Sequence, residues 1–474
     1  MASVDEICAT AKRRLQPTSH ERLIVERTSE EIQSAVENQC RKAGLAADVR
    51  VEGSVAKDTW IREYVDIDIF MLVSPELTKE QLADVCLPIA RRAMRGHRII
   101  ERFAEHPYVE AFVKKNREEL RVNVVPCYKV ERGNWLSATD RSPFHTRYIR
   151  EHMPNEMRDE VRLLKAFLRS TGTYGADIKT GGFSGMLAET LVLGFNGFIN
   201  TARNLAEWNE DCYLDVERYY ENRADEIRKI FREPLVVIDP IDKGRNLGAA
   251  VRAEQLWNLV AASRHFLKKP SARFFTAPRI KPLTLTEYRR KVAGLGSGLL
   301  CLSFGKIDVV VDILWSQLYR TQRALSNFLT TNDFQIIRSA GWSDEKTINV
   351  ILFELETLRI PRSRRHEGPP VSRAMESASF VTKHDGGLST VSGPWIENRR
   401  WVVQKLRGNV DAEHLLNSAL KSRASTIGIA PVFTKALKRK VVVLNERTLE
   451  PMIADADFSR FMRSFLAGRP IWFA

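Results

Sequence analysis

Residues 65–73 constrain the fold of this chain more than any other segment. The run Val65-Asp-Ile-Asp-Ile-Phe-Met-Leu-Val73 is alternating and rich in β-branched side chains, which predicts a β-strand. A strand this apolar must be covered by a packed core, so the chain must build a sheet around it. Asp66 and Asp68 are two residues apart, so they point to one face of that strand, about 6.5 Å apart along it.

This pair of acids predicts a cation site. Two carboxylates buried together repel each other unless a cation lies between them, and Mg²⁺ held by carboxylates and substrate phosphates would relieve that cost. Gly53-Ser54 precedes the strand. Gly53 lets the backbone approach a phosphate, and Ser54 can donate its hydroxyl and N–H at a predicted helix start. An Asp-x-Asp pair alone is a weak signal, but Gly-Ser followed by Asp-x-Asp on a strand is considerably more specific.

The chain predicts an α+β, multidomain protein in three parts. Residues 20–44 show helical periodicity, residues 47–52 and 121–126 are strand-like, and Pro126 is expected to end the second strand. We therefore expect a small α+β sheet domain over residues 1–150. Residues 151–270 look mostly helical, with one helix from an Asn155 N-cap to a Gly172 stop. A basic region of mixed α/β character follows over residues 271–474.

The charge is uneven along the 474 residues. Residues 1–250 hold 38 basic and 40 acidic side chains, whereas residues 251–474 hold 35 basic and 19 acidic ones. The basic half predicts a polyanionic partner, RNA or DNA before membrane. Six scattered cysteines without a C-x-x-C pair favour a reducing cytosol. No signal peptide and no apolar run long enough to span a membrane is evident, so we expect a cytoplasmic protein.

Gly-Ser followed by Asp-x-Asp resembles the polymerase-β-like nucleotidyltransferases, and further motifs narrow the likeness to the archaeal-type, class I CCA-adding tRNA nucleotidyltransferases. They run in order across nearly the whole chain, with weaker stretches around 276–340 and after 410. The motifs are Gly53-Ser-Val-Ala-Lys-Asp-Thr-Trp60, Glu105-His-Pro-Tyr108, Val124-Val-Pro-Cys-Tyr128, Asp140-Arg-Ser-Pro-Phe-His145, Val161-Arg-Leu-Leu-Lys165, Gly182-Phe-Ser-Gly185, Asp239-Pro-Ile-Asp-Lys-Gly-Arg-Asn246 and Pro394-Trp-Ile-Glu-Asn-Arg-Arg-Trp401.

The resemblance implies template-independent addition or repair of the 3′-terminal CCA of tRNA from CTP and ATP. It makes residues 1–150 the catalytic domain, 151–270 a nucleotide-binding neck, and 271–474 a body and tail that bind the acceptor arm of tRNA. A homodimer is left open. Asp66 and Asp68 would bind Mg²⁺, which activates the tRNA 3′-hydroxyl. The implied nucleotide-binding residues are Gly53, Ser54, Lys57, Ser142, His145, Lys165, Tyr174, Ser184 and Arg245.

Two of these positions have structural alternatives. Lys165 belongs to a basic stripe with Arg158, Arg162 and Arg169, spaced 4, 3 and 4 apart on the predicted helix, and such a stripe is as often a solvated face as a phosphate site. Arg245 is expected before a helix start, where a guanidinium can contact base edges and phosphates. In the resembling family this arginine is implicated in choosing C or A. The alternative is that it fixes its own loop by pairing with Asp239 or Asp242.

Asn123 is the departure that matters. The family pattern requires a third metal-binding carboxylate immediately before Val-Val-Pro-Cys-Tyr, and asparagine has the shape of aspartate but cannot help to deprotonate the attacking hydroxyl. Glu119 shares the strand face but lies about 13 Å away. We therefore hypothesise that the chain binds tRNA and nucleotide but transfers slowly or not at all. Gly181 and Met186 stand where the pattern has arginine and tyrosine.

Two other functions stay open. A poly(A) polymerase or oligoadenylate synthetase shares Gly-Ser and Asp-x-Asp, but does not explain Asp140-Arg-Ser-Pro-Phe-His145 or the segment before Trp401. A non-catalytic RNA-binding protein would explain Asn123 and the basic half. It gives no physical reason for the paired aspartates.

Overall fold

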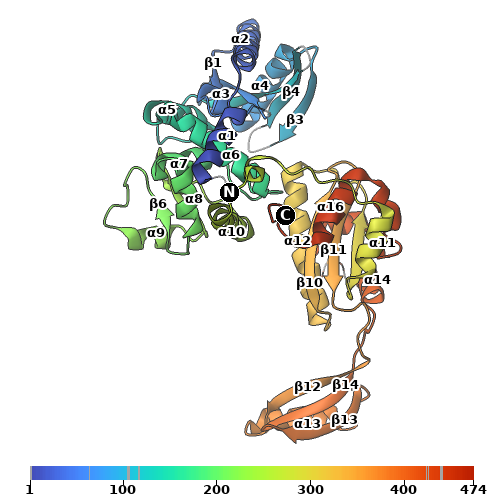
Figure 1. Cartoon of the computed structure of the whole chain (residues 1–474). Helices are drawn as coiled ribbons and strands as arrows, with labels where there is room; N and C mark the ends of the chain where they lie inside the picture. The colour runs from blue at the N-terminus through green and yellow to red at the C-terminus, as the bar shows by residue number, and fades with distance from the viewer. Residues whose placement is uncertain are drawn as a thin grey trace. The chain divides into compact units, whose positions relative to one another are not determined.

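The computed structural model describes residues 3–62, 64–103, 107–115, 118–422, 424, 426–437 and 441–473. These form two compact units: unit 1 spans residues 1–279 and 470–474, and unit 2 spans residues 280–469 (Figure 1). Within these ranges no helix is long and apolar enough to cross a membrane. The Glu105 and His106 positions of one sequence motif lie outside the described residues.

Unit 1 begins with a five-stranded sheet of order β1-β2-β5-β4-β3. β2 and β5 are parallel, and the other neighbours are antiparallel. The strands are β1 (Ala47–Glu52), β2 (Asp66–Val73), β3 (Arg98–Phe103), β4 (Pro107–Lys115) and β5 (Glu118–Tyr128). The helices here are α1 (Val4–Leu15), α2 (Ser19–Lys42), α3 (Gly53–Ala56) and α4 (Lys79–Ala93).

The two faces of β2 have different environments. Ile67, Ile69 and Met71 are fully buried in a core shared with α2 and α4. Asp66 and Asp68 point to the opposite face, which α2 and α4 do not cover and which continues into a small apolar cluster around Phe70. Asp66 and Asp68 therefore lie on the face of the sheet that α2 and α4 leave uncovered.

Most of the expected elements are found. The strands at 47–52 and 65–73 and the helix at 20–44 correspond to β1, β2 and α2. Gly53 opens α3, as expected for the Gly-Ser step. Pro126 does not end its strand, so that prediction was wrong. It stays within β5 opposite Met71, and because the pairing of β5 with β4 stops at Val124, no donor toward β4 is needed at Pro126.

The rest of unit 1 is mainly helical. Its elements are α5 (Ser142–His152), α6 (Met157–Thr171), α7 (Gly185–Phe195), α8 (Phe198–Ala206), α9 (Ala224–Ile230) and α10 (Ala253–Lys268), with a small sheet of β6 (Tyr213–Leu214), β7 (Val236–Asp239) and β8 (Asp242–Asn246) and the 3₁₀ turns η1 (Thr139–Arg141) and η2 (Ala272–Phe275). Gly172 ends α6 in the left-handed conformation, as predicted. The N-cap is Glu156 and not Asn155.

The end of the chain returns to unit 1 after all of unit 2. The indole of Trp472 is buried and donates a 2.8 Å hydrogen bond to Asn258 Oδ1 on α10. Ile471 lies against Gly172 at the end of α6. Unit 2 is thus a long insertion between α10 and the last residues of unit 1.

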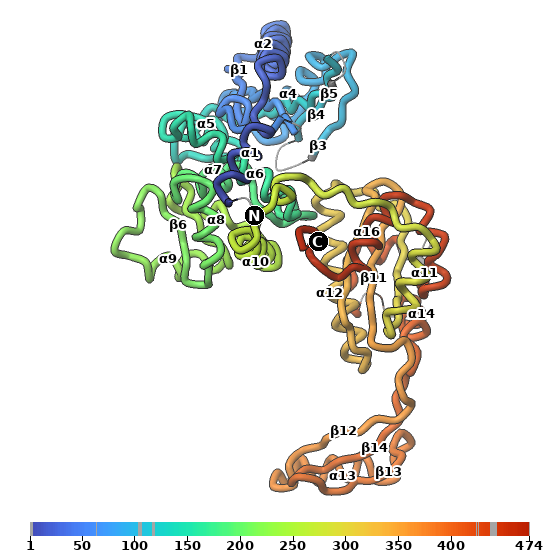
Figure 2. The backbone as a smooth tube through the Cα atoms, in the orientation of Figure 1, coloured from blue at the N-terminus to red at the C-terminus, as the bar shows by residue number. Residues whose placement is uncertain are grey.

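Unit 2 contains two sheets, of order β10-β11-β9-β15 and β12-β14-β13, and the strands of the second sheet lie together with α13 (Figure 2). Its strands are β9 (Gly298–Phe304), β10 (Ile336–Ser343), β11 (Asn349–Leu355), β12 (Ser363–Pro370), β13 (Thr390–Glu397), β14 (Arg400–Leu406) and β15 (Val441–Asn445). Its helices are α11 (Leu285–Ala293), α12 (Val311–Thr331), α13 (Ala374–His384), α14 (Ala412–Ser422), α15 (Pro431–Leu437) and α16 (Ala456–Ala467), with the turn η3 (Glu450–Ala454). The mixed α/β character expected for the basic region is confirmed.

Candidate active site

The backbone at Gly53 lies so close to the Asp68 carboxylate that a residue with a Cβ would not fit there. Its φ is +69°, and a Cβ at this position would lie 2.2 Å from Asp68 Oδ2. Glycine adopts positive φ without a steric penalty, so it satisfies both demands. The turn from β1 into α3 thereby places Ser54 on the wall of a cavity of about 1080 Å³ that also touches Asp66, Lys165 and Tyr174.

Asp68 and Asn123 are directly opposite each other on the parallel strands β2 and β5. Asn123 Nδ2 donates a 2.9 Å hydrogen bond to Asp68 Oδ1. Burial raises the pKa of Asp68 to about 6; the hydrogen bond from Asn123 acts against this shift, and the charge of Asp66 adds to it. The amide therefore stabilises the Asp68 carboxylate without supplying a second charge.

Asp66 is bound by an arginine that the sequence interpretation missed. Arg121, opposite Asp66 on β5, donates from Nε to Asp66 Oδ1 at 2.5 Å and from a terminal nitrogen to Asp66 Oδ2. The same guanidinium lies 3.4 Å from Oε1 of the buried Glu110 on β4. Arg121 stands two residues before Asn123, and this spacing on a strand was the signal that could have revealed it.

Lys57 and Lys165 converge on one buried carboxylate, Glu189 of α7. Their Nζ atoms lie 2.6 Å from Glu189 Oε2 and 3.1 Å from Oε1, and Thr59 donates to Oε1 at 2.5 Å. Burial alone would raise the pKa of Glu189, but Lys165 and Lys57 outweigh it and lower the pKa to about 2. Glu189 was not predicted from the sequence, because nothing local marks an acid on an apolar helix as a partner of two distant lysines.

The basic stripe on α6 is not a solvated face. Arg162 is buried and donates to the Trp60 and Asp58 carbonyls at 3.0 and 2.6 Å, and Lys165 is buried against Glu189. Arg169 stacks on Tyr64, with 3.2 Å from its Cζ to the ring centre. Tyr174 is bridged to Phe183, and burial raises its pKa to about 12, so it stays a neutral hydroxyl. Lys165, Arg169 and Tyr174 line the larger cavity.

A second cavity, of about 320 Å³, is lined by Asp68. It is lined by Gly53, Lys57, Asn123, Ser142, His145 and Met186, among others. Asp66 thus lines the larger cavity and Asp68 the smaller one. Of the predicted nucleotide-binding residues, Ser54, Lys165 and Tyr174 line the larger cavity and Gly53, Lys57, Ser142 and His145 line the smaller one, whereas Ser184 and Arg245 line neither.

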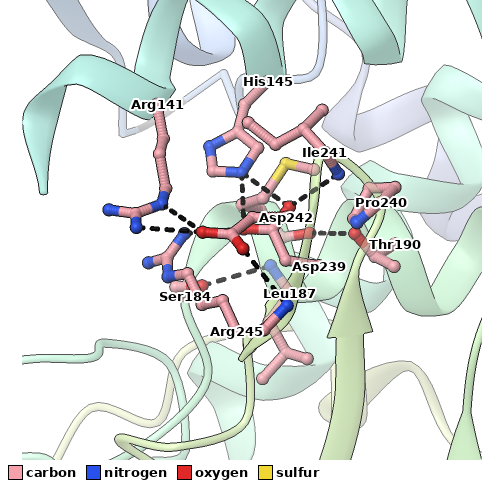
Figure 3. A network of polar contacts seen from close by, with 12 residues as sticks. Arg141, His145, Ser184, Leu187, Thr190, Asp239, Pro240, Ile241, Asp242 and Arg245 are labelled. Carbon is pink, nitrogen blue, oxygen red and sulfur yellow. Dashed lines mark hydrogen bonds and ion pairs between the residues drawn. The ribbon is translucent and has the colours of Figure 1, made fainter. Parts of the chain in front are cut away.

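A buried network joins α5 to the β7–β8 turn (Figure 3). His145 Nε2 lies 2.9 and 3.0 Å from the two oxygens of the fully buried Asp239. Burial lowers the pKa of His145. Burial would raise the pKa of Asp239, but the hydrogen bond from His145 and its other donors outweigh this and lower it. The pair is therefore a neutral imidazole that donates Nε2–H to a carboxylate.

Arg245 is part of this network, and its predicted position before a helix was wrong. It lies on β8, whereas the next helix starts at Ala253. Its side chain donates to Asp239 Oδ2 at 2.8 Å, which is the loop-fixing alternative. Asp242 is instead held by Arg141 at 3.0 Å. Arg245 remains 38 % exposed.

Ser184 and the two departures around it have local explanations. Ser184 caps α7 by accepting a hydrogen bond from the Leu187 N–H at 3.1 Å. A Cβ on Gly181 would lie 2.3 Å from Arg252 Nε, so the Arg252 side chain occupies the space beside the position where arginine was expected. Met186 lines the smaller cavity. A guanidinium is thus retained near this motif, supplied from the start of α10.

The acids do not form the three-carboxylate metal site of the family pattern. Both carboxylate oxygens of Asp66 accept hydrogen bonds from Arg121. Asp68 accepts a hydrogen bond from the amide of Asn123, which lies at the position of the third carboxylate. Among the residues that the structure describes, no group of three or more His, Cys, Asp or Glu side chains is placed to hold a metal ion.

Comparison with known proteins decides the family. Residues 33–154, 159–276 and 295–445 match three families, described as "Nucleotidyltransferase domain", "tRNA nucleotidyltransferase, second domain" and "CCA-adding enzyme, C-terminal domain". The chain is 33 % identical to the CCA-adding enzyme of Haloarcula marismortui, covering 88 % of this chain and 89 % of that one. For the CCA-adding enzyme of Methanothermobacter thermautotrophicus the values are 30 %, 95 % and 96 %. The chain belongs to the CCA-adding enzyme family.

The expected family and α+β multidomain fold are thus confirmed. CCA-adding enzymes are tRNA nucleotidyltransferases, and the activity of this chain is template-independent addition of CCA to tRNA. Such nucleotidyltransferases work on ATP and CTP with a divalent metal ion. The three-domain boundaries and the individual site residues stay predictions.

Proposed function

We propose that this member of the family binds tRNA with CTP or ATP at the acid face of β2 and transfers the nucleotide slowly or not at all. The observation that carries the proposal is the contact between Asn123 and Asp68. Asn123 Nδ2 donates to Asp68 at the position where a third acid would accept the proton of the attacking hydroxyl. An amide has no basic oxygen for that proton.

Several features support binding of the triphosphate here. Ser54, at the start of α3, lines the same cavity as Lys165, Tyr174 and Arg121, and a hydroxyl beside cations suits phosphate oxygens. His145, which lines the smaller cavity, and Arg245 both contact Asp239, and such polar side chains can contact a base. Mg²⁺ is the ion we expect with the triphosphate, although the residues around Asp66 and Asp68 do not fit a three-carboxylate site.

We assign the acceptor arm of tRNA to unit 2 and its flanks. Residues 251–474 carry an excess of 16 basic side chains, from 35 basic and 19 acidic residues. A-form RNA hides its major-groove edges, so an enzyme that accepts many tRNAs recognises shape and phosphates. The six cysteines are free thiols, which suits a cytoplasmic location. A homodimer remains an expectation from the family resemblance alone.

The test uses tRNA that lacks its terminal CCA, incubated with radiolabelled CTP and ATP. The unmodified chain should incorporate CMP and AMP at least about 100-fold more slowly than N123D, the typical contribution of a general base. The matched control is N204D, which adds the same acid at an exposed site on α8 and should leave the rate unchanged. Equal rates for the unmodified chain and N123D would end the proposal of slow transfer.

The products of the same reaction separate the two remaining functions. Extension that stops after C, C and A supports CCA addition, whereas a long A tail would indicate a poly(A) polymerase. A purely RNA-binding chain should bind neither CTP nor ATP. Calorimetric titration of the chain with each triphosphate therefore tests that alternative independently of the rate.

A further inference from the structure

Two rows of side chains cross the open face of the sheet. In the first, Asp66 of β2 is opposite Arg121 of β5, which is opposite Phe112 of β4. In the second, Asp68 is opposite Asn123, which is opposite Glu110. Residues that are directly opposite in a sheet point to the same face. Arg121 therefore stands on the acid face, diagonal to both Asp68 and Glu110.

Arg121 connects acids on the two strands that flank it. On one side it binds both oxygens of Asp66. On the other side it lies 3.4 Å from Glu110, which is buried and also accepts from Arg102 Nε at 2.7 Å. A two-pronged guanidinium–carboxylate contact is among the strongest polar contacts in proteins. The Arg121 side chain is 47 % exposed, so the contact lies at the surface of the site and not in the core.

Two of the three acids Asp66, Asp68 and Glu110 already have a cationic partner without an added ion. Asp66, Asp68 and Glu110 supply three negative charges, and Arg121 and Arg102 supply two positive ones. A divalent cation is attracted to carboxylates whose charge is uncompensated. To reach Asp66, such an ion must first displace the guanidinium from both of its oxygens. It would then meet a neutral amide at Asn123 instead of an acid.

We propose that Arg121 is a built-in counter-ion that weakens divalent metal binding at Asp66 and Asp68 by holding Asp66 to Glu110. This inference rests on the proposed function, because it takes the acid face as the site of nucleotidyl transfer. It makes Arg121 a positioning residue whose effect is separate from that of Asn123. Arg121 then lowers the metal affinity by pairing with the metal-binding side chain of Asp66, and Asn123 lowers it by lacking a negative charge.

The experiment measures Mn²⁺ binding by electron paramagnetic resonance in the full chain, without nucleotide. R121Q should bind Mn²⁺ at least about tenfold more tightly than the unmodified chain, because a charge-assisted pair no longer has to be broken. The same gain should appear when R121Q is compared in the N123D background. The matched control is R98Q: Arg98 lies on the neighbouring strand β3, stacks on Phe112 and pairs with Glu119 at 3.3 Å.

R98Q removes the same charge from the same sheet but does not touch Asp66, so its Mn²⁺ affinity should stay within about threefold of the unmodified chain. Equal affinities for R121Q and the unmodified chain would overturn the inference, as would an equal gain in R98Q. Calorimetric binding of CTP in the presence of excess Mg²⁺ tests the proposed function separately. If CTP fails to bind to any variant while R121Q gains Mn²⁺, then the proposed function is wrong and the role of Arg121 stands.

Discussion

Replacing Glu189 by glutamine tests the buried cluster beneath the nucleotide site. Glu189 is fully buried and is the shared partner of Lys57, which is 7 % exposed, and Lys165, which is 2 % exposed. Glutamine keeps the shape but leaves two buried ammonium groups without a counter-charge. Removing one partner of a buried ion pair costs about 3–5 kcal/mol, so E189Q should lower the unfolding free energy of unit 1 by about that amount.

The lowered pKa of Glu189 has the same physical origin, the two ammonium groups beside its carboxylate. The pKa falls from 4.5 to about 2 in the folded chain, a difference of about 2.5 pKa units, or about 3 kcal/mol. Because the folded pKa is depressed, this stability is present above pH 4.5 and is lost as the pH falls toward 2. The difference between the unmodified chain and E189Q should therefore narrow by about 1 kcal/mol per pH unit below pH 4.5.

The assay is urea unfolding of the full chain, with hydrogen–deuterium pulse labelling and mass spectrometry of α7 peptides at each urea concentration. The control is E26Q, which removes the same charge from an exposed position on α2 and should stay within about 0.5 kcal/mol of the unmodified chain. A loss below about 1 kcal/mol in E189Q, or a difference from the unmodified chain that does not change between pH 7 and pH 3, would refute the reasoning.

Two further predictions concern Gly53 and tRNA binding. G53A should abolish CTP binding in calorimetry, because its Cβ would lie 2.2 Å from Asp68 Oδ2. The control G96A changes a glycine that also has positive φ but meets nothing within 4 Å, so it should only lower the unfolding free energy by about 1 kcal/mol. Equal CTP affinity in the two variants would contradict this prediction. The dissociation constant for tRNA should rise steeply with salt concentration, because the slope of its logarithm against the logarithm of the salt concentration is set by the number of phosphates neutralised. Filter binding from about 50 to 300 mM KCl measures this slope. A dissociation constant that does not change over this range would exclude phosphate contacts as the basis of binding.

The sequence predicted the parts of this site that are local in the chain. The alternation of residues 65–73 and the Gly-Ser step set β2 and α3, and both lie where expected. Pro126 misled the strand prediction, since a proline disrupts a strand only where its missing N–H would have met a neighbour. Whether β5 has a neighbour beside Pro126 depends on where β4 starts. The local sequence around Pro126 does not indicate where that is.

The contacts that define the chemistry are distant in sequence and could not be predicted. Arg121 is 55 residues from Asp66, and Glu189 is 132 residues from Lys57. Each pairing depends on strand order or helix packing, which single-sequence periodicity does not contain. Asn123 and its place beside Asp68 were recognised because motifs fixed their positions, whereas Glu110, opposite Asn123 on β4, became evident only from the register of the sheet.

The return of the chain to unit 1 affects the order in which the protein can fold on the ribosome. Trp472 and Ile471, which pack on α10 and at the end of α6, are synthesised only after all of residues 280–469. At about 5–20 residues per second, that delay is on the order of 10 to 40 s. During this time unit 1 must persist with the surface where the indole of Trp472 later packs left uncovered.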